Sequence, residues 1–177
     1  MRPRTRRFTT AFAALALAGA ALAQPAPVAD PQAPMQKLAF LVGEWEGEAW
    51  IQMGPERRDT VSQHESVEWR LGGEVLLIQG TGREGERTVH SALATLAWDP
   101  TRQAYSMWTY ASGRGTLQPE VEVGDGALVW SFTVPGGGRR VRYTARLDEQ
   151  ERWIETGETS TDGQTWHPFM AMTLSRK

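Results

Sequence analysis

The chain of 177 residues contains no cysteine and only three histidines, His64, His90 and His167. The absence of cysteine excludes disulfide bonds, thiolate metal sites, a cysteine nucleophile and a lipid-modified N-terminal cysteine. Zinc sites need three or four converging ligands, and neither His64 nor His90 has a second ligand at suitable spacing on its strand face. The sequence therefore predicts no metal site. Nucleophile-elbow, phosphate-loop and HExxH motifs are also absent.

Long hydrophobic runs are missing except near the N-terminus. Residues 1–23 begin with four arginines, continue through an apolar stretch over 8–22 and end on a small-x-small pattern at Ala23. This order is typical of a Sec-type signal peptide cleaved after Ala23, and it predicts a periplasmic or secreted protein. An uncleaved anchor is the alternative, but the apolar stretch is shorter than the roughly 20 residues that span a bilayer. Export by the twin-arginine route is a second alternative.

The sequence also has few basic residues relative to acidic ones once the N-terminal segment is set aside. The leader carries four of the 19 basic residues and none of the 21 acidic ones, so the 154 residues that remain have a net charge of −6. This charge argues against nucleic-acid binding, which relies on phosphate neutralisation. Residues 24–34 contain four prolines, which block helix and sheet alike, and we expect a tether there. The folded domain is predicted over 35–177, without a membrane span.

Short runs rich in β-formers fill this domain after a predicted helical turn over 35–42. Nine turn segments separate ten runs between Gly43 and Ser175, about 13 residues each. Parallel strands need crossover connections of a dozen or more residues, so the strands must be antiparallel neighbours in an up-and-down sheet. A sheet of this length has to curl or close to protect its edges. We expect an all-β, closed barrel of about ten strands.

Alternation along the runs predicts which side chains face the interior. In the first run, Trp45 and Ala49 alternate with glutamates, which indicates one buried and one solvated face. The faces of 74–81 and 102–112 stay open because both are apolar. The predicted inner face comprises Trp45, Gly47, Ala49, Ile51, Met53, Leu117, Val121, Val123, Leu128, Trp130, Phe132, Val141, Tyr143, Ala145, Leu147, Trp166, Met170, Met172, Leu174 and Arg176.

The segment Gly43-Glu44-Trp45, with Arg176 in the last run, resembles the closing motif of the calycin superfamily of lipocalins and fatty-acid-binding proteins. In those barrels the tryptophan plugs one end and a basic residue of the final strand packs across it. The resemblance implies the same barrel closure here by Gly43, Trp45 and Arg176. A guanidinium over an indole face contributes about 0.5–2 kcal/mol.

Three longer segments resemble a bacterial family known as domain of unknown function 1579. They are LAFLVGEWEGEAW at 38–50, AWDP at 97–100 and TDGQTWHPFMAMTLSRK at 161–177. The resemblance covers both ends and the middle of the domain, and it implies a barrel. The family has no assigned activity.

The chain is also similar to nitrobindin, a haem-binding barrel that shares the pattern of Gly43, Trp45 and Gly47. In nitrobindin a histidine of the last strand ligates the iron, which makes haem the cofactor to test; otherwise the cofactor is unknown. The corresponding position in this sequence is Phe169 or Met170. His167 falls on the predicted outer face, so this chain departs from the nitrobindin pattern.

Two polar residues interrupt the inner face of the second run. Gln63 and Glu65 share the parity of Val61, Val67 and Trp69. A buried carboxylate is costly unless it is hydrogen-bonded or reaches water. Two explanations remain open: a β-bulge reverses the alternation, or the barrel holds a wet cavity. We favour the cavity, because a ten-stranded barrel has more interior than side chains fill.

The glycines over 80–85 formally match a dinucleotide-binding loop. That motif requires a following helix, whereas TVHSALATLAW predicts a strand. We therefore expect a hairpin loop.

Together these features predict an exported barrel that binds a small, largely apolar molecule. One alternative is a haem-binding, nitrobindin-like barrel. Another is a ligand-free interaction module of the cell envelope that exposes Trp50, Trp108 and Tyr110. No catalytic residue is predicted, and Glu65 alone is a candidate acid or base. The predicted cavity lining comprises Gln63, Glu65, Trp130, Phe132, Tyr143 and Met170.

Overall fold

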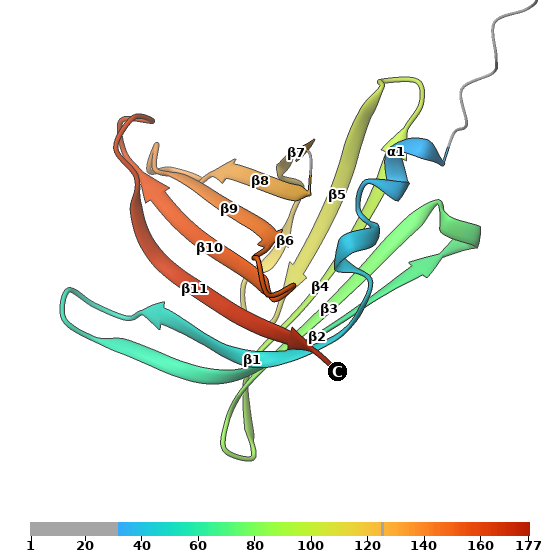
Figure 1. The fold of residues 1–177 in the computed structure, drawn as a ribbon. Helices are drawn as coiled ribbons and strands as arrows, with labels where there is room; N and C mark the ends of the chain where they lie inside the picture. The colour runs from blue at the N-terminus through green and yellow to red at the C-terminus, as the bar shows by residue number, and fades with distance from the viewer. Residues whose placement is uncertain (1–31, 125) are drawn as a thin grey trace, which may run out of the picture.

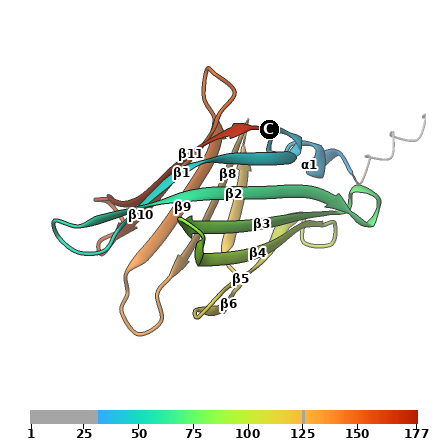
Figure 2. The same ribbon diagram turned by 90° about the horizontal axis from the view of Figure 1, so that it is seen from below.

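A computed structural model describes residues 32–124 and 126–177. It shows one antiparallel sheet in the order β6-β5-β4-β3-β2-β1-β11-β10-β9-β8-β7, curled around a common interior (Figures 1 and 2). The predicted all-β, antiparallel up-and-down class is confirmed, whereas the predicted full closure is not found, because the curled sheet keeps two edges. The strands are β1 Gly43–Gln52, β2 Arg58–Arg70, β3 Val75–Glu84, β4 Arg87–Asp99, β5 Ala104–Ala111, β6 Gly115–Leu117, β7 Glu120–Gly124, β8 Ala127–Thr133, β9 Arg140–Leu147, β10 Trp153–Ser160 and β11 His167–Arg176.

The first and last long strands close the sheet on one side. β1 pairs with β11 in antiparallel register, from Trp45 opposite Arg176 to Ile51 opposite Met170. On the other side, β6 and β7 are the two edges of the sheet and do not pair with each other. Pro119 lies between them and has no N–H to donate. The run predicted as one strand is therefore split into two, which gives eleven strands rather than about ten.

A short helical segment precedes β1 at one end of the curled sheet (Figure 1). It consists of α1 (Ala33–Gln36) and the 3-10 turn η1 (Ala39–Leu41), and it begins two residues before the predicted domain start. The Tyr105 hydroxyl of β5 donates a hydrogen bond of 2.7 Å to the Pro34 carbonyl. The predicted signal peptide and most of the tether lie outside the described residues. Within the described part of the chain, no helix is long and apolar enough to cross a membrane.

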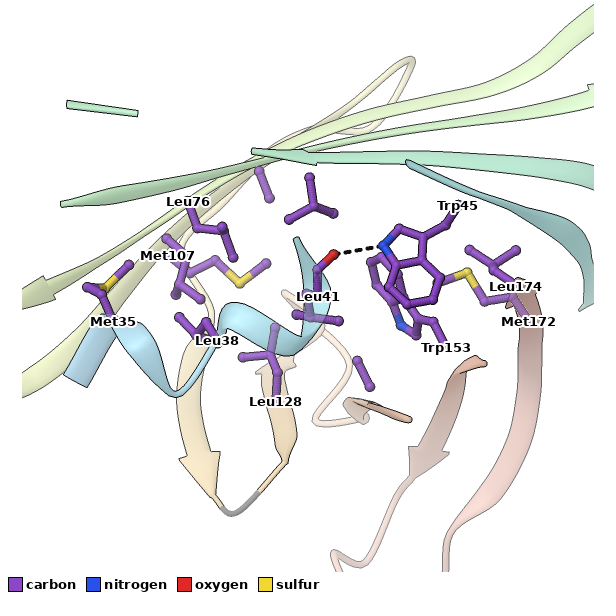
Figure 3. Packing of buried hydrophobic residues seen from close by; sticks show 14 of the residues in the cluster. Met35, Leu38, Leu41, Trp45, Leu76, Met107, Leu128, Trp153, Met172 and Leu174 are labelled. Atoms are coloured by element: carbon purple, nitrogen blue, oxygen red, sulfur yellow. Dashed lines mark hydrogen bonds between the residues drawn. The ribbon is translucent and has the colours of Figure 1, made fainter. Parts of the chain in front are cut away.

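The hydrophobic core fills the end of the barrel beside this helical segment. Figure 3 shows Leu38 and Leu41 packed against strand residues, with the Trp45 indole next to Trp153. The Trp45 Nε1–H donates a hydrogen bond of 2.7 Å to the Leu41 carbonyl. Burial of these apolar side chains contributes about 25 cal/mol for each Å² removed from water. The helical segment thus closes one mouth and leaves the opposite half of the interior for the site described below.

Most of the predicted inner face is buried or half-buried, but Arg176 is exposed at the end of β11, and two further residues depart from the prediction. Met53 lies at the end of β1 and is 57% exposed. Trp166 precedes β11 and stacks against Arg142 of the outer face, with the guanidinium 4.0 Å from the ring centroid. The inward assignment of Trp166 is therefore wrong. The cause is a register shift between Gly157 and Glu158 in the β10–β11 pairing, which reverses the alternation upstream of it.

The structure also assigns the two strands whose faces stayed open. Leu76 and Ile78 of β3 pack in the interior, and so do Tyr105 and Met107 of β5. Trp108, which follows Met107 and lies on the opposite face of β5, is 44% exposed.

Candidate functional site: a cavity with two buried carboxylates

A cavity of about 420 Å³ occupies the half of the barrel away from the helical segment. Its wall is mostly aliphatic and aromatic and draws on nearly every strand. The six residues predicted to line it, Gln63, Glu65, Trp130, Phe132, Tyr143 and Met170, all border this space. That they bind a ligand stays a prediction.

The polar pair of β2 faces the cavity without any bulge. The β1–β2 register is continuous from Gly43 to Gln52, and Gln63 and Glu65 lie opposite Gly47 and Trp45. Gln63 is 6% exposed and Glu65 is 8% exposed. The Gln63 side-chain amide donates a hydrogen bond of 2.7 Å to the Glu65 carboxylate. Of the two explanations considered above, a polar cavity accounts for this row.

Glycines on the neighbouring strand make room for these side chains. Gly80 lies opposite Glu65 and Gly82 lies opposite Gln63 in the β2–β3 ladder. A Cβ at Gly80 would stand 2.5 Å from Glu65 Oε1. The hairpin loop predicted over 80–85 is corrected accordingly, because β3 continues to Glu84 and the turn follows it. The glycines serve close approach within a strand.

Glu155 of β10 is a second buried carboxylate in the same cavity, and sequence reasoning missed it. It is 8% exposed and borders the cavity together with Trp153 and Tyr143. Its position follows from alternation, since Trp153, Glu155 and Gly157 share one buried face of β10. That alternation in residues 153–157 was the available signal.

Burial governs the ionisation of both carboxyl groups. Burial raises the pKa of Glu65 to about 7, and the hydrogen bond from Gln63 partly offsets this rise. Burial, and then the nearby charge of Glu65, raise the pKa of Glu155 to about 8. The indole N–H groups of Trp153 and Trp130 face the Glu155 carboxylate and lower its pKa slightly. The Trp153 N–H nevertheless lacks an acceptor in hydrogen-bond geometry.

Three aromatic rings form one wall beside these carboxyl groups. Trp130 and Tyr143 stack with centroids 3.9 Å apart and planes at 9°. Phe169 meets the Tyr143 ring edge-on at 5.7 Å. Gly157, opposite Tyr143, leaves space for this ring, because an added Cβ would lie 2.9 Å from it. Burial and the charge of Glu155 raise the pKa of Tyr143 to about 12, so the phenol stays protonated.

The predicted closing residues meet at the other end of the barrel. The Arg176 guanidinium lies 4.1 Å from the centroid of the fully buried Trp45 ring. It also donates hydrogen bonds to the carbonyls of Val42 and Phe40. Gly43 has a φ of 137°, and a side chain there would collide with Arg176. Trp45 in turn meets Trp153 edge-on at 5.8 Å, so the closing stack continues to the cavity floor.

The histidines do not supply the iron ligand that the nitrobindin resemblance implies. Phe169 and Met170 border the cavity, whereas His167 is exposed at the start of β11. His90 borders the cavity from β4, and burial lowers its pKa. His64 lies on the outer face, 2.9 Å from Glu44. The residues at the nitrobindin position therefore do not fit a histidine-ligated haem. Within 32–124 and 126–177 no cluster of three metal-ligating residues occurs.

The outer aromatic residues do not form one surface. Trp108 and Tyr110 lie on β5 and are each 44% exposed. Trp50 lies on β1, with three strands between them, and is covered by the Arg58 guanidinium at 4.0 Å. The shared patch expected for an interaction module is therefore absent from the described surface.

Comparisons with known proteins show the family of this chain and a similar fold among solved structures. No curated protein matches the chain. The crystal structure of Rv2717c from M. tuberculosis is similar, with a TM-score of 0.59 and 15% identity over 84% of this chain and 99% of that one. A protein of unknown function of the DUF3598 family from Nostoc punctiforme has a TM-score of 0.44 and 18% identity, over 79% and 48%. The family described as protein of unknown function DUF1579 matches residues 30–176, so the chain belongs to the DUF1579 family.

Proposed function

We propose that this protein is an exported barrel that binds a small, largely apolar molecule in its cavity. The observation that carries the proposal is the cavity of about 420 Å³, whose wall is mostly apolar and aromatic and also holds polar side chains such as Gln63, Glu65 and Glu155. Sites for small molecules have this character and are usually preformed. An interior filled by side chains would have favoured an interaction module instead.

Export is the second part of the proposal and rests on the order of residues 1–23. Cell fractionation of the native host tests it, with N-terminal sequencing of the mature protein. We expect a mature chain that begins at Gln24 in the periplasm or the medium. A cytoplasmic chain that retains Met1 would contradict export and leave the binding proposal intact.

Isothermal titration calorimetry with naphthylethanol tests binding, because this aromatic alcohol matches the aromatic wall. We expect Trp130→Ala to weaken its affinity by about tenfold or more, which corresponds to about 1.4 kcal/mol. Trp108→Ala, on the outer face, is the matched control and should leave the affinity unchanged. If Trp130→Ala lowers the melting temperature but leaves the affinity unchanged, Trp130 is a core residue without a role in binding.

A further inference from the structure

We infer that the ligand of this cavity carries a cationic nitrogen, held between Glu65 and Glu155, on an otherwise apolar body. The inference rests on the proposed function and specifies its ligand class. Two carboxylates from β2 and β10 converge on one enclosed space, and each is more than nine-tenths buried. Both border the same cavity, and the charge of Glu65 acts on Glu155 across it.

Neither carboxylate has a cationic partner within the described chain. The ion pairs of residues 32–124 and 126–177 involve other acidic groups, all of them more exposed. Glu65 receives only the Gln63 amide, and the buried Trp153 N–H beside Glu155 lacks an acceptor. An unpaired buried carboxylate is costly. A ligand that brings its own positive charge and N–H donors would offset that cost.

The aromatic part of the lining has the same preference. The other charged residues that border the cavity are Asp59 and Glu84, which are ion-paired with Arg57 and Arg87, and Arg114 and the partly buried His90. The stacked Trp130 and Tyr143 rings lie beside Glu155, and aromatic faces attract cations. The lining thus suits an amine and disfavours a carboxylate ligand of the fatty-acid type.

A matched series of three probes tests this inference by calorimetry at pH 8. Naphthylethylamine, naphthylethanol and naphthylacetic acid share one aromatic body and differ in the charge of the polar end. We expect the amine to bind about tenfold or more tightly than the alcohol, and the acid to bind most weakly. In Glu65→Gln and Glu155→Gln, the affinity for the amine should fall about tenfold. Affinity for the alcohol should stay within about threefold, because glutamine preserves shape and polarity.

The outcomes separate this inference from the proposed function. If the alcohol binds and the amine binds no more tightly, or the acid binds best, the cationic ligand is overturned while the binding function stands. If none of the three binds, the proposed function fails and the inference fails with it. Near-ultraviolet circular dichroism verifies that both glutamine variants are folded. If a glutamine variant does not fold, the comparison of the three probes on the unaltered protein still tests the inference, because it needs no variant.

Discussion

Gly80 lies directly opposite Glu65 in the β2–β3 ladder, and its missing side chain is the space in which the Glu65 carboxyl group sits. Gly80→Ala should therefore displace the carboxyl group and lower the free energy of unfolding by about 1–3 kcal/mol, the usual cost of overpacking. Urea denaturation measures this change. Gly124→Ala is the control, because its Cβ would meet no atom within 4 Å.

A double-mutant cycle tests whether the collision with Glu65 causes the loss of stability in Gly80→Ala. In a Glu65→Ala background the same Gly80→Ala substitution should cost much less, since the colliding atoms are gone. Additive costs of the two substitutions would show that the carboxyl group is not what Gly80 accommodates.

Stability should fall as the pH rises from about 4.5 to about 8. Both carboxyl groups have pKa values near 4.5 when unfolded and of about 7 and about 8 when folded. In this interval the folded state binds more protons than the unfolded state, so the free energy of unfolding decreases with pH. At about 1.4 kcal/mol for each pKa unit, the two groups together lower it by an amount on the order of a few kcal/mol.

Urea denaturation of the unaltered protein and of Glu155→Gln across this pH range measures the effect. The substitution should flatten the slope and make the protein more stable at pH 8. A stability that rises with pH in the unaltered protein, or a variant with the same slope, would contradict the assignment of Glu155.

The indole N–H groups of Trp130 and Trp153 should report the same ionisation. Both face the Glu155 carboxylate, and its negative charge changes the shielding of a nearby N–H. In nitrogen-15 correlation spectra we expect these two indole signals to titrate with midpoints between about 7 and about 8. Because the carboxyl groups are coupled, the steps belong to the pair rather than to either residue. The Trp108 signal, on the outer face, should stay constant.

Arg176 should stabilise the closed end through both its charge and its shape. Arg176→Ala removes the contact with Trp45 and the hydrogen bonds to two carbonyls, and should cost about 1–3 kcal/mol in urea denaturation. Arg176→Lys should recover part of this, since lysine keeps the charge but cannot span both carbonyls. The adjacent Lys177→Ala serves as control, because its ion pair with Glu46 is exposed to solvent and contributes little to stability.

The strand pattern could be predicted where one face was apolar and the other charged. The resemblance to the calycin closing motif paired Trp45 with Arg176, and alternation supported this by assigning both to the inner face, since the period of two fixes the face. The same reasoning failed at Trp166, because a register shift leaves no trace in residue types. It also joined β6 and β7 into one run, although Pro119 carried the signal for their separation.

Part of the site could also be predicted from the alternation of apolar and polar residues. Gln63 and Glu65 stood out because they interrupt an apolar row, and the continuous register of β2 places them in the interior. Glu155 was missed because Trp153 and Ile154 put an apolar residue on each face of β10, so the face that Glu155 shares with Trp153 was not marked as the inner one. That the two glutamates converge depends on how the sheet curls, which a strand-by-strand pattern does not contain.

The missing ladder between β6 and β7 has a consequence for how a ligand enters the barrel. Elsewhere, widening the wall would break backbone hydrogen bonds between strands, whereas β6 and β7 share no ladder and are joined by the chain over 118–119. Leu117 and Gly115 of β6 border the cavity. We expect a ligand to enter the cavity between β6 and β7. The backbone amide hydrogens of these two strands should then exchange with solvent faster than those of the β1–β11 ladder.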